Sequence, residues 1–140
     1  MTSSYNISTD KSLLDLDVIH QFLSRDSYWA KNIPLEVVQK SIENSLCFGV
    51  YDINQQVGFA RVITDYATIA YLSDVFILPN HRGYGLSKKL IQFITEYPNL
   101  QKLRRWLLIT RDAQALYQKF GFVNPEDPSL FMHRKLISSY

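Results

Sequence analysis

A glycine-containing turn between two regular segments is the part of this sequence whose residues could do chemistry most directly. Residues 74–78 are typical of the end of a strand, the turn is Arg82-Gly83-Tyr84-Gly85, and an amphipathic helical pattern starts at Leu86. The first backbone N–H groups of a helix have no acceptor within it and lie at the positive end of its dipole. Because glycine lets an anion approach the backbone closely, the segment predicts a phosphate or pyrophosphate site.

Two common phosphate-binding turns do not fit this spacing. A P-loop requires Gly-x-x-x-x-Gly-Lys-Ser/Thr, and a dinucleotide-binding turn requires a third glycine or alanine where Lys88 stands. Residues 82–87 (Arg-Gly-Tyr-Gly-Leu-Ser) instead resemble the pyrophosphate loop of the Gcn5-related N-acetyltransferases, the GNAT family, which reads Arg/Gln-x-x-Gly-x-Gly/Ala. Ser87 occupies the last small position of that pattern, and serine is small enough for close approach.

A second segment resembles the same family. Residues 113–122 follow its other signature, Ala-x-x-Leu-Tyr-x-Lys-x-Gly-Phe. A glycine turn alone is weak support, since glycine marks many ordinary connections. Two signatures in the family's order are hard to obtain by chance. The resemblance is strong from residue 72 to 122, whereas the first half of the chain fits by the order of its elements.

The resemblance implies how acetyl-CoA, the acyl donor, would be held. In the family, the backbone of the strand before the turn binds the pantetheine arm as though it were an added strand, and the amides of the turn bind the pyrophosphate. An amide near Ile77 would polarise the thioester carbonyl. The cofactor-binding residues would be Val75, Phe76, Ile77, Arg82, Gly83, Tyr84, Gly85, Leu86, Ser87 and Lys88.

The resemblance also implies two catalytic residues. Tyr117 matches the tyrosine that protonates the leaving thiolate in many members; the alternative is a packing aromatic between helix and sheet. Asp74 occupies the place of a strand carboxylate that takes the proton of the acceptor ammonium, although it could cap the strand or pair with an arginine. Asp65 and Tyr71 are the next candidates for the base. Alternation along the strand places Asp74 on the same face as Phe76.

Aromatic side chains are candidates for the acceptor site. Tyr28 and Trp29 lie in a predicted loop and, with Tyr71, are expected to bind the acceptor substrate. They favour a small-molecule amine slightly over a protein terminus. The three histidines show no ligand spacing, so no metal is expected.

The elements that must position these residues follow from hydrophobic spacing, which has a period of two in strands and 3.6 in helices. Predicted strands cover residues 5–8, 46–51, 57–63, 68–78, 105–110 and 131–136, and predicted helices cover 12–25, 34–45, 86–97 and 112–119, with Ser12 and Asp112 as N-caps. The 105–110 run is nearly continuous in apolar residues, which predicts a central strand. The predicted fold class is α/β: a mixed, mostly antiparallel central sheet, splayed in the middle, with helices on both faces, as in the acyl-CoA N-acyltransferase fold.

Length and composition set the remaining expectations. The chain has 140 residues, which fits one domain spanning 1–140, and its formal net charge of +2 is too small to indicate nucleic acid or an anionic membrane as partner. Its one cysteine, Cys47, lies in an apolar run and is expected to be a buried structural thiol. No signal peptide or membrane span is recognised, so we expect a cytoplasmic protein, either a monomer or a homodimer through an edge strand.

The function predicted from the sequence is an N-acetyltransferase in which a primary amine attacks the thioester of acetyl-CoA directly. The alternative is a non-catalytic module that senses acyl-CoA, which would need the phosphate turn but neither Tyr117 nor a base. A weaker third reading is a structural subunit whose turn at Gly83 binds nothing.

Overall fold

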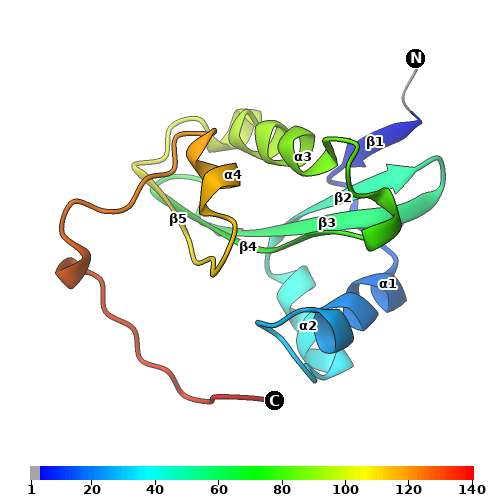
Figure 1. Ribbon diagram of the computed structural model, residues 1–140, viewed down its shortest axis with the longest axis horizontal. Helices are drawn as coiled ribbons and strands as arrows, with labels where there is room; N and C mark the ends of the chain where they lie inside the picture. The colour runs from blue at the N-terminus through cyan, green and yellow to red at the C-terminus, as the bar shows by residue number, and fades with distance from the viewer. Residues whose placement is uncertain (1–3) are drawn as a thin grey trace.

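The computed structural model describes residues 4–140, which form a five-stranded mixed sheet in the order β1-β2-β3-β4-β5 (Figure 1). The first four strands pair antiparallel with their neighbours, and β5 lies parallel to β4. This is the predicted fold class. The strands are β1 Tyr5–Ser8, β2 Leu46–Asp52, β3 Gln55–Thr64, β4 Ile69–Ile77 and β5 Arg105–Leu108.

Helices cover both faces of the sheet (Figure 1). α1 (Leu16–Gln21) and α2 (Leu35–Glu43) pack on one face over a core that includes Phe22 and Phe76. α3 (Leu86–Thr95) and α4 (Gln114–Gln118) cover the other face over a core that includes Leu90 and Tyr117. Short 3-10 turns occur at Lys11–Leu13, Pro79–His81, Pro98–Leu100 and Pro128–Leu130, and Phe22–Asp26 is a π-helical turn. Within residues 4–140, no helix has both the length and the hydropathy that crossing a bilayer requires.

The sheet opens between β4 and β5. The two strands pair only from Ile69 opposite Arg105 to Leu72 opposite Leu108, after which β4 continues to Ile77 without β5 beside it. A bulge lies where the opening begins: the register between β3 and β4 shifts between Phe59 and Arg61, and Asp74, two residues beyond Leu72, has a positive φ of 55°. A bulge bends its strand and increases the local twist. The predicted splay of the sheet is therefore present, and it lies directly before the glycine turn.

The predicted helix caps were wrong at two places. Ser12 does not cap a helix over 12–25; Asp10 accepts from the Ser12 amide at 2.9 Å, the chain is extended at Leu14, and Asp15 caps the shorter α1. Aspartate is as favourable as serine at an N-cap. Asp10 therefore caps the 3-10 turn at Lys11–Leu13, and Asp15 caps α1. The residue at the N-cap of α4 is Ala113, and Asp112 makes no cap there.

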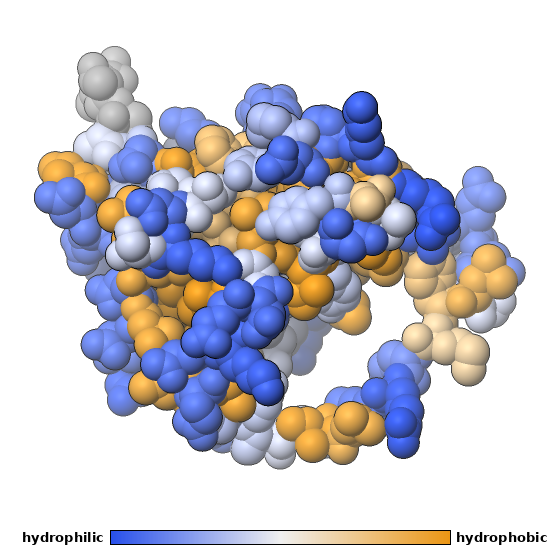
Figure 2. Space-filling view, turned by 180° about the vertical axis from the view of Figure 1, so that it is seen from behind, coloured by the Kyte–Doolittle hydropathy of each residue, from blue (hydrophilic) through white to orange (hydrophobic). Residues whose placement is uncertain are grey.

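Two predictions about the end of the chain were also wrong. The run at 105–110 is an edge strand that ends at Leu108, and residues 131–136 form no strand. After α4 the chain curves away from the sheet, and its last part lies apart from the body (Figure 1). The space-filling view shows open space between that part and the rest of the molecule (Figure 2). Among residues 4–140, no strand pairs with the strand-like segment at 131–136 or with the outer edge of β5.

Candidate active site

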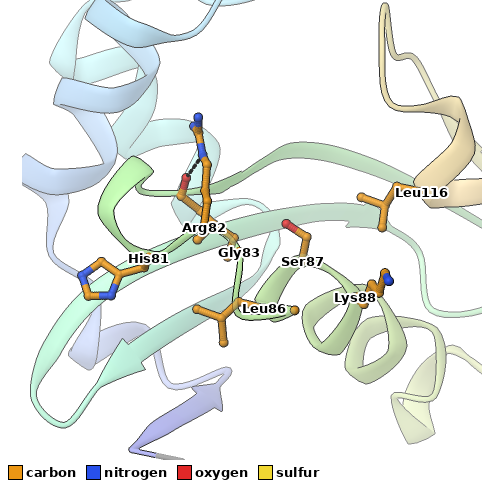
Figure 3. A pocket seen from close by; sticks show the side chains of 9 residues that line it. His81, Arg82, Gly83, Leu86, Ser87, Lys88 and Leu116 are labelled. Atoms are coloured by element: carbon orange, nitrogen blue, oxygen red, sulfur yellow. Dashed lines mark hydrogen bonds between the residues drawn. The ribbon is translucent and has the colours of Figure 1, made fainter.

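The glycine turn and the start of α3 form one wall of a cavity of about 180 Å³ (Figure 3). Gly83 and Gly85 have φ values of 89° and 75°, which other residues adopt only with strain, and a side chain added at either would meet nothing within 4 Å. Gly85 is the N-cap of α3, so the amides of the first turn of that helix have no acceptor in the helix. The backbone is thus exposed to an approaching anion where the sequence predicted it.

The remaining predicted loop residues do not all face this cavity. It is lined by Ile77, His81, Arg82, Gly83, Gly85, Leu86, Ser87, Lys88 and Leu116. The Tyr84 side chain is directed elsewhere, since its ring lies 6.3 Å from that of Tyr5 and is mostly exposed. The Arg82 guanidinium is turned back, and its Nε donates to the Ile77 carbonyl at 2.9 Å (Figure 3). Arg82 therefore fixes the junction between β4 and the turn.

Lys88 adds positive charge to the wall of this cavity, and Lys119 lies near Lys88. Lys88 lines the cavity, and contact with its side chain, together with its charge, lowers the pKa of Lys119. Two ammonium groups held this close repel each other, and a bound phosphate would relieve the repulsion. The sequence signature contained Lys119, but its fixed spacing from Tyr117 gave no sign that the residue would reach α3.

The unpaired end of β4 leads to the same cavity. The side chains of Val75 and Phe76 are packed into the two opposite cores, so these residues can offer a ligand only their backbone groups. Ile77 is buried and lines the cavity. A strand whose neighbour has diverged presents N–H and C=O groups that an extended ligand can pair with. Binding of a pantetheine arm by the backbone of these residues stays a prediction.

Tyr117 lies on α4, next to Leu116 of the cavity wall. Only 9% of its surface is exposed, and its ring packs edge-on against Phe122 at 5.9 Å. Burial, with smaller contributions from the nearby Tyr28 and Asp112, raises the pKa of Tyr117 to about 12. The phenol therefore stays protonated at neutral pH and retains a hydrogen that it can donate.

Asp74 is held by two donors. Its carboxylate accepts from Arg61 Nε at 2.9 Å and from Trp29 Nε1 at 2.8 Å, and both members of the ion pair are largely buried. The same arginine also donates to Ser45 Oγ at 3.1 Å. Through Trp29, which contacts the Phe22 ring, Asp74 faces the side of the sheet that holds Phe76, as alternation predicted. Sequence reasoning left the arginine partner unnamed, because residues 61 and 74 are brought together only by the β3–β4 register.

The predicted acceptor residues join the two catalytic candidates. Tyr28 and Trp29 contact each other edge-on at 5.1 Å; Trp29 binds Asp74, while Tyr28 acts electrostatically on Tyr117. The Tyr28 hydroxyl accepts from the Arg111 amide at 3.0 Å, and the Arg111 guanidinium lies 4.0 Å from the centre of the Tyr28 ring. The loop after α1 is therefore fastened across the open side of the sheet, next to α4.

The other two candidates for a base have different environments. Tyr71 is half-buried on β4, and burial raises its pKa, with a smaller effect from Asp74. Asp65 lies in the β3–β4 turn, where it accepts from the amides of Ala67 and Thr68 at 2.9 and 2.7 Å. These bonds lower the pKa of Asp65 well below its usual range, so it is a poor base and a good turn residue. Among residues 4–140, no three His, Cys, Asp or Glu side chains are grouped so that they could hold a metal ion.

Comparison with known proteins identifies the family. The family model for the GNAT acetyltransferase domain matches residues 43–124. A candidate acetyltransferase of Gibberella zeae is 36% identical over 135 residues, covering 82% of this chain and 76% of its own length. A crystal structure of a candidate GNAT acetyltransferase from Xanthomonas campestris pv. campestris superposes with a TM-score of 0.92 at 53% identity, covering 94% of this chain and 93% of that one.

A structure solved with acetyl-CoA, a predicted acetyltransferase from Clostridium acetobutylicum, is similar in fold alone, with a TM-score of 0.67 at 14% identity, and 94% of each chain is covered. The chain belongs to the GNAT family of acetyltransferases and is an acyltransferase.

Proposed function

We propose that this protein transfers the acetyl group of acetyl-CoA to a primary amine of a small molecule by direct attack. The observation that carries the proposal is the continuity of one surface: the unpaired end of β4 leads into the glycine turn, and α4 contributes Leu116, the neighbour of Tyr117, to the same cavity. Membership of an acetyltransferase family favours this enzyme over the acyl-CoA sensor that the sequence left open.

The donor site would bind acetyl-CoA by its two polar parts. The backbone of Val75, Phe76 and Ile77 would pair with the amide groups of the pantetheine arm. The amides from Gly83 to Lys88 would bind the pyrophosphate, with Lys88 and Lys119 supplying charge. This arrangement is supported by the open Cβ positions of the glycines and by the lowered pKa of Lys119.

The chemical step can be written with every proton placed. The acceptor ammonium gives a proton to Asp74, directly or through a water, and the free amine attacks the thioester carbonyl. An N–C bond forms and the C–S bond breaks, so the electron pair of that bond leaves on sulfur. Tyr117 donates a hydrogen bond to this thiolate as it forms, and the thiolate then takes a proton from solvent. The attacking nitrogen releases its second proton to solvent as the amide forms, and Asp74 afterwards releases the first. No covalent enzyme intermediate is needed, and Cys47, which is buried, takes no part.

The acceptor would lie between the two catalytic groups, against Tyr28, Trp29 and Tyr71. Aromatic faces attract a cation, and a carboxylate beside them adds a hydrogen-bond acceptor. Although both oxygens of Asp74 are engaged by Arg61 and Trp29, each retains a second lone pair. The combination supports a compact primary ammonium as the group presented to the thioester.

The test is thiol release from acetyl-CoA with a panel of primary amines, namely polyamines, amino acids, amino sugars and a peptide with a free N-terminus. Saturable turnover with at least one small amine is the expected result, with the N-acetyl product identified by mass spectrometry. Turnover confined to the peptide would reject the small-molecule acceptor. Absence of turnover with every amine, in a protein that binds acetyl-CoA, would reject amine acetylation and leave donor binding in place.

A further inference from the structure

The C-terminal segment, residues 131–140, carries apolar side chains that the rest of residues 4–140 leaves largely exposed. Met132 is 94% exposed and Leu136 is 77% exposed, and Phe131 and Ile137 are also exposed. The segment forms neither helix nor strand and runs apart from the body (Figure 1). In the space-filling view, apolar patches of this part of the chain face open space (Figure 2). A monomer rarely leaves so many large apolar side chains without a partner.

The outer edge of β5 is the complementary feature. β5 is the last strand of the sheet, so the N–H and C=O groups on its outer side are unpaired by any strand of residues 4–140. Its sequence, Arg105-Trp106-Leu107-Leu108, is as apolar as that of an interior strand, and the next residue, Ile109, is 81% exposed. An exposed, apolar strand edge is a template for another strand.

The C-terminal segment cannot fill its own edge in the antiparallel sense. An antiparallel neighbour of β5 must start beside Ile109 and finish beside Arg105. Phe131, which begins the segment, already lies against Arg105, whose guanidinium is 5.6 Å from the centre of the Phe131 ring. The nine residues that follow therefore lead away from β5, and at about 3.3 Å per residue they can reach roughly 30 Å.

We propose that two copies of this chain exchange C-terminal segments, with residues 131–137 of each copy adding as an antiparallel strand to the β5 edge of the other. Each copy supplies one strand and one edge, so the exchange closes on itself as a two-fold dimer. The added strand becomes the new edge of the sheet, and His133-Arg134-Lys135 at its centre would discourage a third copy from adding. Both features that lack a neighbour in one chain thus gain one in the dimer. The proposal goes beyond the acetyltransferase activity and does not depend on it.

The mass of the protein in solution is the first test, by analytical ultracentrifugation from about 1 to 100 µM, because a dimer with a Kd well below about 1 µM stays associated throughout this range. The expected result is a dimer for the native chain and a folded monomer for a chain ending at Leu130. A matched control that lacks only residues 138–140 should remain a dimer. A native monomer throughout the range, or a dimer that survives the longer truncation, would overturn the proposal.

Cross-linking tests the exchange itself. A chain carrying Ile109→Cys is mixed with a chain carrying Met132→Cys and oxidised, and the expected product is a mixed disulfide dimer. Both positions are exposed, so neither change should prevent folding, and the native Cys47 is buried. A chain carrying both changes should also form interchain disulfides. A monomer closed by an intrachain disulfide, or a dimer without the mixed disulfide, would refute antiparallel exchange.

Discussion

Replacement of Tyr117 by phenylalanine tests the catalytic assignment most sharply, because it removes one hydroxyl and keeps the ring that packs on Phe122. Full proton transfer from this phenol to the leaving thiolate is unfavourable, since the pKa of Tyr117 is raised to about 12 whereas that of a thiol is ordinarily about 8.5. Burial of the thiolate beside the phenol would raise the pKa of the thiol and so reduce the difference between the two pKa values. We therefore expect Tyr117 to act chiefly as a hydrogen-bond donor to the developing charge.

A hydrogen bond to a charged group contributes about 1.5 to 3 kcal/mol. At about 1.4 kcal/mol per factor of ten, Tyr117→Phe should lower kcat by roughly 10- to 150-fold. The thiolate exists only late in the reaction, so the Kd for acetyl-CoA should not change, and kcat and kcat/KM should fall together. Thiol release followed with a chromogenic disulfide measures both constants, and the buried Cys47 adds little background.

A second buried tyrosine provides the matched control. Tyr51 lies on β2, burial raises its pKa to about 12 as well, and its hydroxyl has no hydrogen-bond partner among residues 4–140. Tyr51→Phe should leave kcat unchanged. If Tyr117→Phe is as active as Tyr51→Phe, the hydroxyl has no role in catalysis and Tyr117 is a packing residue.

Three further results follow from the site. Asp74→Asn should abolish most of the turnover. Because it leaves the Arg61 charge largely buried and unpaired, it should also lower the free energy of unfolding by about 3 kcal/mol in urea titrations. Adding Arg61→Gln should restore stability but not turnover, and recovery of turnover would exclude Asp74 from the mechanism. Lys119→Ala should weaken acetyl-CoA binding about 5- to 10-fold at low salt, and much less at high salt; equal weakening by the exposed Lys102→Ala would point to general charge instead. Burial raises the pKa of Cys47 to about 11. Iodoacetamide should therefore alkylate Cys47 at least ~100-fold more slowly in the native chain than in the unfolded chain near pH 8. Comparable rates would contradict the burial of Cys47.

The part of the fold that local patterns determine was predictable. Five of the six expected strands exist, and the glycine turn leads into α3 as the positive φ values of Gly83 and Gly85 require. The two wrong predictions at the end of the chain share one cause. The apolar composition of β5 and the strand-like pattern at 131–136 indicate that each needs a neighbour, but they do not say whether that neighbour belongs to the same copy.

The residues of the candidate site that belong to a sequence motif could be predicted. The contacts that depend on strand register or helix packing could not. The turn, Tyr117 and Asp74 could be located from their place in the two signatures and the strand. The pairing of Asp74 with Arg61 depends on the register shift between Phe59 and Arg61. The proximity of Lys119 to Lys88 depends on how α4 packs beside α3. Neither contact has a fixed spacing in the sequence.

Calorimetric titration of acetyl-CoA tests the central claim most directly, with the native chain, Gly85→Glu and Gly85→Ala compared at one ionic strength. Glutamate would place an anion where the pyrophosphate should bind, while alanine adds the same backbone strain with a methyl group that meets nothing within 4 Å. The account predicts saturable binding by the native chain, modest weakening by alanine and loss of binding in a folded glutamate variant. Native-like binding by the glutamate variant, or no binding by the native chain, would contradict a coenzyme site at this turn.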